Sequence, residues 1–341
     1  MRLTRPIGGF FPLHEPDNVA PEQSVLAHWT GERRYVSYVN ARSAFAALVD
    51  LLEPELVWVP AYTCADFVAS TWRGKVRFYH VGRNLEADLS ELKREAIPGD
   101  LVVGVNYFGY PIGSALTGLR ATRRDLFFVE DRAQALAPSK DFWGDWCLYS
   151  PRKLLGVADG GILIASADQP LPTCSEAPNA VQLWTAPLLR YEDCSETENE
   201  IWYAAHRAKE AQMSVSQQRM TELSKWILSR SSIDRLVDCR RRNWRVLQDY
   251  LGRWLAFEHD CMVAPLGFVI EVPAMKRAKL LHTLHSEGIF ASVHWPLLAS
   301  ASEDFPREHD LCSRLITLPC DHRYDQGDMR ILASRVSALL G

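Results

Sequence analysis

The chain has 341 residues, of which 47% are hydrophobic and 23% are charged, and its formal net charge at pH 7 is -4. This composition indicates a globular protein with a substantial core and excludes a disordered or low-complexity chain. The weak negative charge gives no electrostatic reason for nucleic acid or an anionic membrane to be the main partner. We therefore expect a small-molecule ligand.

The N-terminal residues and the cysteines bear on the cellular compartment. Residues 1–18 contain only a brief apolar stretch that Gly and Pro interrupt, so we expect neither a signal peptide nor a membrane span, and a cytoplasmic protein. The eight cysteines have irregular spacings and no C-x-x-C pair, which favours reduced, mostly buried thiols over disulfides or zinc ligands. We interpret His282 and His285 as solvated side chains and expect no metal.

Residues 41–166 alternate between helix and strand patterns. The predicted helices are residues 41–52, 65–72, 88–96 and 115–124, and the predicted strands are residues 56–60, 75–81, 100–108, 125–131 and 146–149, with a last strand after Gly160 and Gly161. Such alternation is typical of a parallel sheet with helices on both faces. Open α/β sheets bind ligands at the loops that follow the carboxyl ends of their strands, so we expect the site there.

The second half of the chain has a different pattern. Residues 167–200 are rich in Pro and poor in periodicity, and we interpret them as an excursion over the surface. Further helical and strand-like segments follow at residues 201–228, 232–251, 265–272, 275–287, 288–296 and 313–320, before a C-terminal helix. This order predicts an N-terminal arm and large domain in residues 1–225 and a smaller α/β domain in residues 226–341.

Common nucleotide-binding and hydrolase motifs are missing from the expected places. There is no G-x-G-x-x-G after the first strand, no G-x-x-x-x-G-K-[ST] and no G-x-S-x-G. Polar residues follow the predicted strands instead: Asp131, Gln134, Ser150 and Lys153. Lys153 lies within the apolar run 146–164, where an unpaired ammonium is costly. Its side chain either extends to solvent, as lysines ordinarily do, or is bonded to another group.

These residue types fit pyridoxal 5'-phosphate (PLP) better than any other cofactor we considered. An amine can form a Schiff base with its aldehyde, and a carboxylate can keep its pyridine nitrogen protonated. The phosphate needs amide donors and hydroxyls, which a helix N-terminus at residues 42–44 and the Ser150 hydroxyl would supply. Each residue alone has an ordinary interpretation as a turn or cap residue, so the specific signal is their order and spacing.

At these residues the sequence resembles the DegT/DnrJ/EryC1/StrS aminotransferases, fold-type-I enzymes that mostly aminate keto-sugar nucleotides. The resemblance covers nearly the whole chain. The segments that carry it in the large domain are "VWVPAYTCADF", "VNYFGYP", "FVEDRAQAL" and "YSPRKLLGVADGG". In the small domain they are "CRRRNWRVLQDYL", "GIFASVHWPL" and "LITLPCDHRYDQGDM". The resemblance implies a PLP-binding large domain with a mostly parallel sheet between helices and a smaller C-terminal α/β domain.

The resemblance also implies a role for individual residues. Lys153 would be the Schiff-base lysine, Asp131 would contact the pyridine nitrogen and Gln134 would lie near the ring hydroxyl. The other cofactor-binding residues would be Ser43, Ala44 and Ser150 at the phosphate and Cys64 beside the ring. Candidate substrate residues are Tyr107, Arg152 and His294.

Several departures from the family pattern predict a divergent branch. Ala41 stands where the phosphate segment usually has Gly, and Ser150 precedes the lysine by three positions rather than the more usual five. Cys64 occupies the position where many relatives place an aromatic ring against the cofactor. An Asn-x-Arg-Met segment, through which a neighbouring subunit often reaches the phosphate, is not found, and Ser214 is the only substitute offered.

Three functions remain open from the sequence. The first is an aminotransferase that moves an amino group from glutamate or glutamine to a keto-sugar nucleotide, acting as a homodimer. The second is a PLP-dependent sugar dehydratase, although relatives that dehydrate carry His where this chain has Lys153. The third is a non-catalytic member of the fold, which the presence of both Lys153 and Asp131 disfavours.

Overall fold

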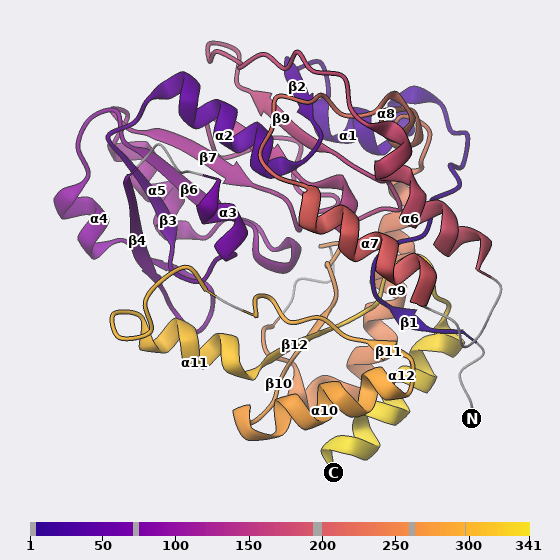
Figure 1. The fold of residues 1–341 in the computed structure, drawn as a ribbon. Helices are drawn as coiled ribbons and strands as arrows, with labels where there is room; N and C mark the ends of the chain where they lie inside the picture. The colour runs from indigo at the N-terminus through magenta and orange to yellow at the C-terminus, as the bar shows by residue number, and fades with distance from the viewer. Residues whose placement is uncertain (1–4, 71–74, 194–199, 259–262, 297) are drawn as a thin grey trace.

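The computed structural model describes residues 5–70, 75–193, 200–258, 263–296 and 298–341. An eight-stranded sheet lies in the upper part of Figure 1, with the strand order β2-β9-β8-β7-β6-β3-β4-β5. The strands are β2 (Tyr35–Tyr38), β3 (Leu56–Pro60), β4 (Lys75–Val81), β5 (Ala87–Asp88), β6 (Leu101–Val105), β7 (Phe127–Asp131), β8 (Trp146–Tyr149) and β9 (Gly161–Ala165). Strands β8, β7, β6, β3 and β4 are parallel, whereas β9 and β5 pair with their neighbours in antiparallel fashion. The predicted mostly parallel sheet is confirmed.

Helices alternate with the parallel strands along the chain, as the pattern predicts. The predicted helices are α2 (Ala41–Leu52), α3 (Ala65–Ala69), α4 (Ser90–Glu95) and α5 (Ser114–Thr122), whereas α1 (Val25–Thr30) precedes them and was not predicted. Helix α2 begins where the Asn40 side chain accepts a hydrogen bond from the Ser43 N–H, and its side chains Phe45 and Leu48 are fully buried. Strands β6, β8 and β9 are buried along their whole length, which explains their uninterrupted apolar sequences.

The C-terminal part of the chain packs around a separate two-stranded antiparallel pair. This pair is β10 (Phe268–Glu271) with β12 (Leu315–Leu318), and the helices are α9 (Ile233–Leu251), α10 (Ala274–Ser286), α11 (Pro306–Arg314) and α12 (Gln326–Leu340). Figure 1 shows α10 and α12 in the lower part of the view. Strand β1 (Ile7–Gly8) pairs in parallel with β11 (Ile289–Phe290), which ties the N-terminal segment to this part. A domain boundary at residue 226 stays a prediction.

The interpretation of residues 167–200 as an irregular excursion is wrong for its second half. Residues Ala180–Glu192 form helix α6, which begins at the Asn179 cap and contains Pro187. The proline interrupts the helical pattern in the sequence. The helix nevertheless forms, and it buries Leu183 and Trp184. The Pro187 carbonyl accepts a hydrogen bond of 3.1 Å from the Leu13 N–H, so α6 also supports the N-terminal segment.

The continuous helical pattern over residues 201–228 is broken in the structure. Helix α7 (Glu200–Gln212) ends at Gln212, and α8 (Glu222–Leu228) begins only after Thr221. Thr221 donates hydrogen bonds of 2.6 Å from its N–H and its hydroxyl to the buried carboxylate of Asp159, 62 positions away. This tertiary contact fixes the chain in a non-helical conformation that local periodicity does not reveal. Strand β2 and helix α11 were also not predicted.

The expectations about membranes, metals and cysteines concern only the described part of the chain. None of its helices is both long and apolar enough to cross a membrane, and it contains no group of three or more His, Cys, Asp or Glu that could hold a metal ion. Free thiols are present at Cys64, Cys147, Cys174, Cys239, Cys312 and Cys320, of which Cys147, Cys312 and Cys320 are buried. Cys194 and Cys261 lie outside the described residues.

Candidate active site

Lys153 lies beyond the carboxyl end of β8, in the short 3-10 turn Pro151–Lys153. Its side chain is exposed to a cavity of about 290 Å³, and its ammonium has no hydrogen bond or ion pair with the described residues. The cavity wall consists of residues 8–11, Arg152, Lys153, Arg240, Leu266, Phe290, Ser292, His294, residues 317–319, Asp321 and Arg323. The N-terminal segment, the lysine loop and the C-terminal part therefore meet around one amine.

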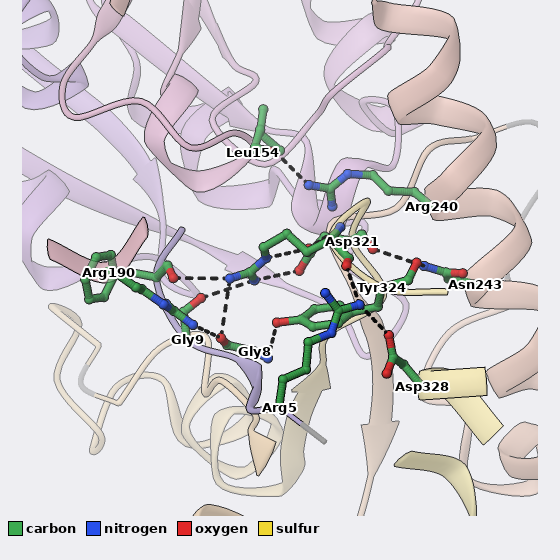
Figure 2. Close-up of polar contacts among 12 residues, drawn as sticks. Arg5, Gly8, Gly9, Leu154, Arg190, Arg240, Asn243, Asp321, Tyr324 and Asp328 are labelled. Carbon is green, nitrogen blue, oxygen red and sulfur yellow. Dashed lines mark hydrogen bonds and ion pairs between the residues drawn. The ribbon is translucent and has the colours of Figure 1, made fainter. Parts of the chain in front are cut away.

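Arg240 of helix α9 holds the backbone next to this lysine. Its side chain is completely buried, and its Nη2 atom donates a hydrogen bond of 2.8 Å to the Leu154 carbonyl (Figure 2). Its Nη1 atom donates to the carbonyls of Pro265 (3.2 Å) and Leu266 (3.0 Å). One guanidinium thus links the lysine loop to the segment that leads into β10.

Asp131 ends β7, the strand next to β8 in the sheet. Its Oδ1 atom accepts a hydrogen bond of 2.8 Å from the Ala133 N–H, while Oδ2 has no hydrogen bond with the described residues. Burial raises the pKa of Asp131 above its ordinary value, and the positive charge of Lys153 acts in the opposite direction. The carboxylate and the amine are therefore close enough to interact, as the sequence predicts.

Gln134 provides the test of whether the site fits PLP. Its Oε1 atom accepts a hydrogen bond of 2.6 Å from the Phe108 N–H, whereas its Nε2 atom is buried and has no partner. The Asn106 Oδ1 atom, next to the same turn, is also buried without a partner. A buried amide donor without an acceptor is costly, and the ring hydroxyl of PLP is an acceptor of the kind that it needs. Together with a free amine and a carboxylate, this donor fits the ring end of the cofactor.

The residues that the sequence predicts at the cofactor phosphate differ in whether their hydrogen-bonding groups already have partners. The Ser43 hydroxyl accepts a hydrogen bond of 3.1 Å from the Ser216 N–H, and the N–H groups of Ser43 and Ala44 bond to Asn40. Ser150 is 5% exposed, and its hydroxyl makes no hydrogen bond with the described residues. Ser150 is therefore the better placed of the two serines to receive a phosphate.

A segment of the same chain covers the N-terminus of α2. The Ser214 carbonyl accepts a hydrogen bond of 3.2 Å from Asn40 Nδ2, and the Met213 carbonyl accepts one of 2.8 Å from Arg42 Nη2. Ser214, named above as a possible contact from a neighbouring subunit, thus contacts this helix within its own chain through its backbone. The sequence offered no signal for this arrangement.

His294 and Arg152 share the cavity with Lys153. The His294 Nδ1 atom lies 2.9 Å from Thr317 Oγ1, and burial together with the charge of Lys153 lowers the pKa of His294 to about 3. The imidazole is therefore neutral at neutral pH. Arg152 is less available, because its Nη1 atom lies 2.5 Å from a carboxylate oxygen of Glu210.

Tyr107 and Cys64 do not line this cavity. The buried Tyr107 hydroxyl donates a hydrogen bond of 2.8 Å to the Tyr62 carbonyl, and its ring lines another cavity with Tyr79 and Tyr110. Cys64 is half-buried at the N-cap of α3 and pairs with Leu298 in an isolated bridge. These two candidates therefore do not belong to the cavity wall around Lys153. Tyr107 is still near Asp131, since burial and the neighbouring Tyr79, Tyr62 and Asp131 groups raise its pKa.

No pattern in the sequence indicated that the N-terminal segment and Arg323 contribute to the cavity wall. Arg323 forms a two-pronged ion pair with Asp321, at 2.7 and 2.8 Å, and donates to the Phe10 carbonyl at 3.1 Å. The Gly8 N–H in turn donates a hydrogen bond of 2.7 Å to the Tyr324 hydroxyl (Figure 2). The "CDHRY" residues were noted only as part of a resemblance, whereas their charged pair lies in the cavity wall.

Neither the known protein-family models nor the curated proteins contain a match to the sequence. Solved structures with the same fold include a DegT DnrJ EryC1 StrS aminotransferase from Brucella abortus, with 16% identity, a TM-score of 0.68 and coverage of 93% of this chain and 88% of that one. Helicobacter pylori PseC, an aminotransferase of pseudoaminic acid biosynthesis, has 14% identity and a TM-score of 0.68 over 98% and 99%. DesI, solved in the presence of its TDP-sugar product, has 17% identity and a TM-score of 0.64 over 92% and 82%.

These similarities extend along almost the whole chain at low sequence identity. They confirm the predicted fold, which is that of the DegT/DnrJ/EryC1/StrS aminotransferases. They also agree with the expectation of a divergent branch.

Proposed function

We propose that this chain is a PLP-dependent aminotransferase that moves an amino group from an amino acid, with glutamate as the expected donor, to a keto-sugar nucleotide. The observation that carries the proposal is the free amine of Lys153, which is exposed to a cavity and is close enough to the carboxylate of Asp131 for their charges to interact. The unpartnered Nε2 atom of Gln134 is a third group of the kind that this cofactor uses. A buried amide nitrogen without an acceptor is costly unless a ligand supplies one.

When bound, PLP would supply an aldehyde that condenses with amines and a pyridine ring that accepts electron density. Lys153 would hold the cofactor through its amine and, once displaced by an amino donor, would remove and return the proton next to the donor nitrogen. Asp131 would hold a proton on the pyridine nitrogen, and Gln134 Nε2 would donate to the ring hydroxyl. Ser150 would donate to the phosphate.

The remaining residues of the cavity would face the substrates. His294 is neutral at neutral pH, so it can donate or accept a hydrogen bond near Lys153 without adding a positive charge. The keto-sugar nucleotide is proposed because PseC acts in pseudoaminic acid biosynthesis and DesI was solved with a TDP-sugar product.

We further propose that the enzyme acts as a homodimer. Large apolar side chains are exposed on helices α6 and α7: Val181 is 81%, Ile201 is 69% and Tyr203 is 52% exposed. Exposed apolar groups on neighbouring helices favour an interface. Light scattering after size-exclusion chromatography should give twice the chain mass, and an active monomer would contradict the homodimer.

The test of the proposed function begins with the purified protein incubated with PLP. We expect a visible absorption band, and borohydride reduction should fix the cofactor on Lys153, as peptide mapping by mass spectrometry can establish. Lys153→Ala should retain no reduced cofactor, whereas Lys75→Ala, a change at an exposed residue of β4, should label normally. Labelling of another lysine, or no cofactor bound, would overturn the proposal.

A further inference from the structure

A second cavity lies beside the N-terminal segment and is rich in arginine. The described residues of its wall include Arg5, Arg190, Arg235 and Arg323, but only two carboxylates, Glu15 and Asp17. Three of these arginines have carboxylate partners, which are Asp328 for Arg5, Asp17 for Arg235 and Asp321 for Arg323. Arg190 has no such partner among the described residues.

The guanidinium of Arg190 is held in place and has no ion pair with the described residues, although the charges of Asp321 and Asp193 act on it. Its Nη2 atom donates a hydrogen bond of 2.9 Å to the Gly8 carbonyl (Figure 2). Its Cζ atom lies over two aromatic rings, 4.9 Å from the centre of the Phe10 ring and 4.7 Å from that of the Trp202 ring. Its Nη1 atom is buried without a partner. Burial and the neighbouring Arg323 lower the pKa of Arg190 to about 10. A buried cation with an unused donor is stabilised further by an anion that accepts a hydrogen bond from that donor.

Two imidazoles in the same wall also have unused nitrogens. His14 is 8% exposed, and its Nε2 atom is buried without a partner. The His322 Nδ1 atom is likewise buried without a partner, and the two rings meet edge to face at 5.2 Å. The backbone N–H of His14 donates a hydrogen bond of 2.8 Å to the Gly156 carbonyl, which fixes the segment that carries the ring. Such groups can donate hydrogen bonds to oxygen atoms of a ligand.

We propose that this second cavity binds a phosphate group through Arg190 Nη1, His14 Nε2 and His322 Nδ1. A guanidinium accompanied by two imidazole donors suits an oxyanion with several equivalent oxygens better than it suits a neutral ligand. The phosphate can be inorganic or can belong to a nucleoside diphosphate, and both sources present the same terminal oxygens. The site does not include Lys153 and does not depend on the proposed aminotransferase activity.

The site can be tested by calorimetric titration of the full chain with inorganic phosphate and, separately, with UDP. We expect binding of at least one of the two, and Arg190→Gln should weaken it by about tenfold or more, because a charged hydrogen-bond donor is lost. Arg83→Gln is the matched control, since the Arg83 side chain is 79% exposed and pairs with Glu271 outside the cavity. If UDP binds and inorganic phosphate does not, the phosphate group that the site binds belongs to a nucleotide. If inorganic phosphate binds, the free ion is enough for binding.

A measurement on the unaltered protein guards against misfolding of a variant. In the spectrum of protein labelled with nitrogen-15 in its imidazoles, phosphate or UDP should move the signals of His14 and His322, assigned through His14→Gln and His322→Gln. Two results would overturn the proposal. The first is a failure of both ligands to bind, and the second is binding that moves neither signal or is equally strong in Arg190→Gln.

Discussion

The Phe108 N–H donates a hydrogen bond of 2.6 Å to Gln134 Oε1, and this bond fixes the Gln134 side chain with its Nε2 atom buried and unpartnered. The two residues follow neighbouring strands, β6 and β7, at the edge of the sheet where the lysine loop also begins. A backbone amide thus fixes the orientation of the unpartnered nitrogen. The Gln134 oxygen contributes to the fold, and we propose that its nitrogen donates to the cofactor.

Gln134→Leu separates these two contributions. The cofactor-free protein should lose about 1–3 kcal/mol in the free energy of unfolding, because the Phe108 N–H becomes a buried donor without an acceptor. The affinity for PLP should fall as well, because the donor to its ring is lost. Urea denaturation and a PLP titration measure the two effects. Gln248→Leu, at an exposed position of α9, should change neither; an unaltered PLP affinity in Gln134→Leu would exclude a contact with the cofactor.

Asp131→Asn tests the carboxylate. The side chain can still accept the hydrogen bond from the Ala133 N–H, so the fold should persist, but an amide cannot hold a proton on the pyridine nitrogen. We expect the reaction with amino donors to slow by about 100-fold or more, with a smaller loss of PLP affinity. Stopped-flow absorption spectroscopy gives the rate, and a rate close to that of the natural protein would show that another residue performs this role.

Arg240→Met removes the link between α9 and the lysine loop. The carbonyls of Leu154, Pro265 and Leu266 would lose their buried donor, so the free energy of unfolding should fall by about 3 kcal/mol or more. Arg242→Met, at an exposed position on the same helix, is the control. Urea denaturation of both variants makes the comparison, and equal stabilities would show that the Arg240 hydrogen bonds contribute nothing.

Acid should destabilise the protein through its buried histidines. Burial lowers the pKa of His14 from the ordinary value of 6.5 to about 4, and burial with the Lys153 charge lowers that of His294 to about 3. Below pH 6.5 the unfolded chain therefore binds protons that the folded chain does not bind. The stabilising contributions of neutral His14 and neutral His294 are therefore present above pH 6.5. They are lost as the pH falls towards about 4 for His14 and about 3 for His294, at up to about 1.4 kcal/mol per pH unit for each histidine.

His14→Asn should reduce the pH dependence by removing one of these contributions. The slope of the unfolding free energy against pH, from urea denaturation between about pH 7 and pH 5, should fall by about 1 kcal/mol per unit. Met275→Ala, at a residue that is 88% exposed, should leave the slope unchanged. An equal slope in His14→Asn and the natural protein would mean that His14 is not the buried, neutral group described here.

The sequence predicts the sheet well because its buried parallel strands are continuous apolar runs; β4, for example, occupies the expected residues Lys75–Val81. It fails where local pattern and tertiary contact disagree. Pro187 obscures helix α6, and the bonds of Thr221 to Asp159 end a pattern that looks helical. The Asn179 cap followed by buried Leu183 and Trp184 was the signal that could have revealed α6.

Part of the candidate site could also be predicted from the sequence, because some of its residues follow the strands of the predicted sheet. Lys153, Asp131 and Gln134 follow the carboxyl ends of neighbouring strands, so topology alone brings them together. The contact that engages the Ser43 hydroxyl joins residues 173 positions apart, and no local pattern records it. Likewise, Arg323 and Arg190 donate hydrogen bonds to carbonyls of the N-terminal segment, which is far from them in the sequence, so no local pattern indicates these contacts.

The most direct test of the proposed function is the half-reaction of the PLP-loaded protein with an amino donor and no sugar. With glutamate or glutamine, we expect the absorption of bound PLP to be replaced by that of pyridoxamine phosphate, with one keto acid released per active site. Lys153→Ala should show no such conversion. If a broad panel of amino acids leaves the spectrum unchanged while a sugar nucleotide alone is dehydrated, the protein is a dehydratase. If neither reaction occurs, it is a non-catalytic member of the fold, and either result contradicts the aminotransferase.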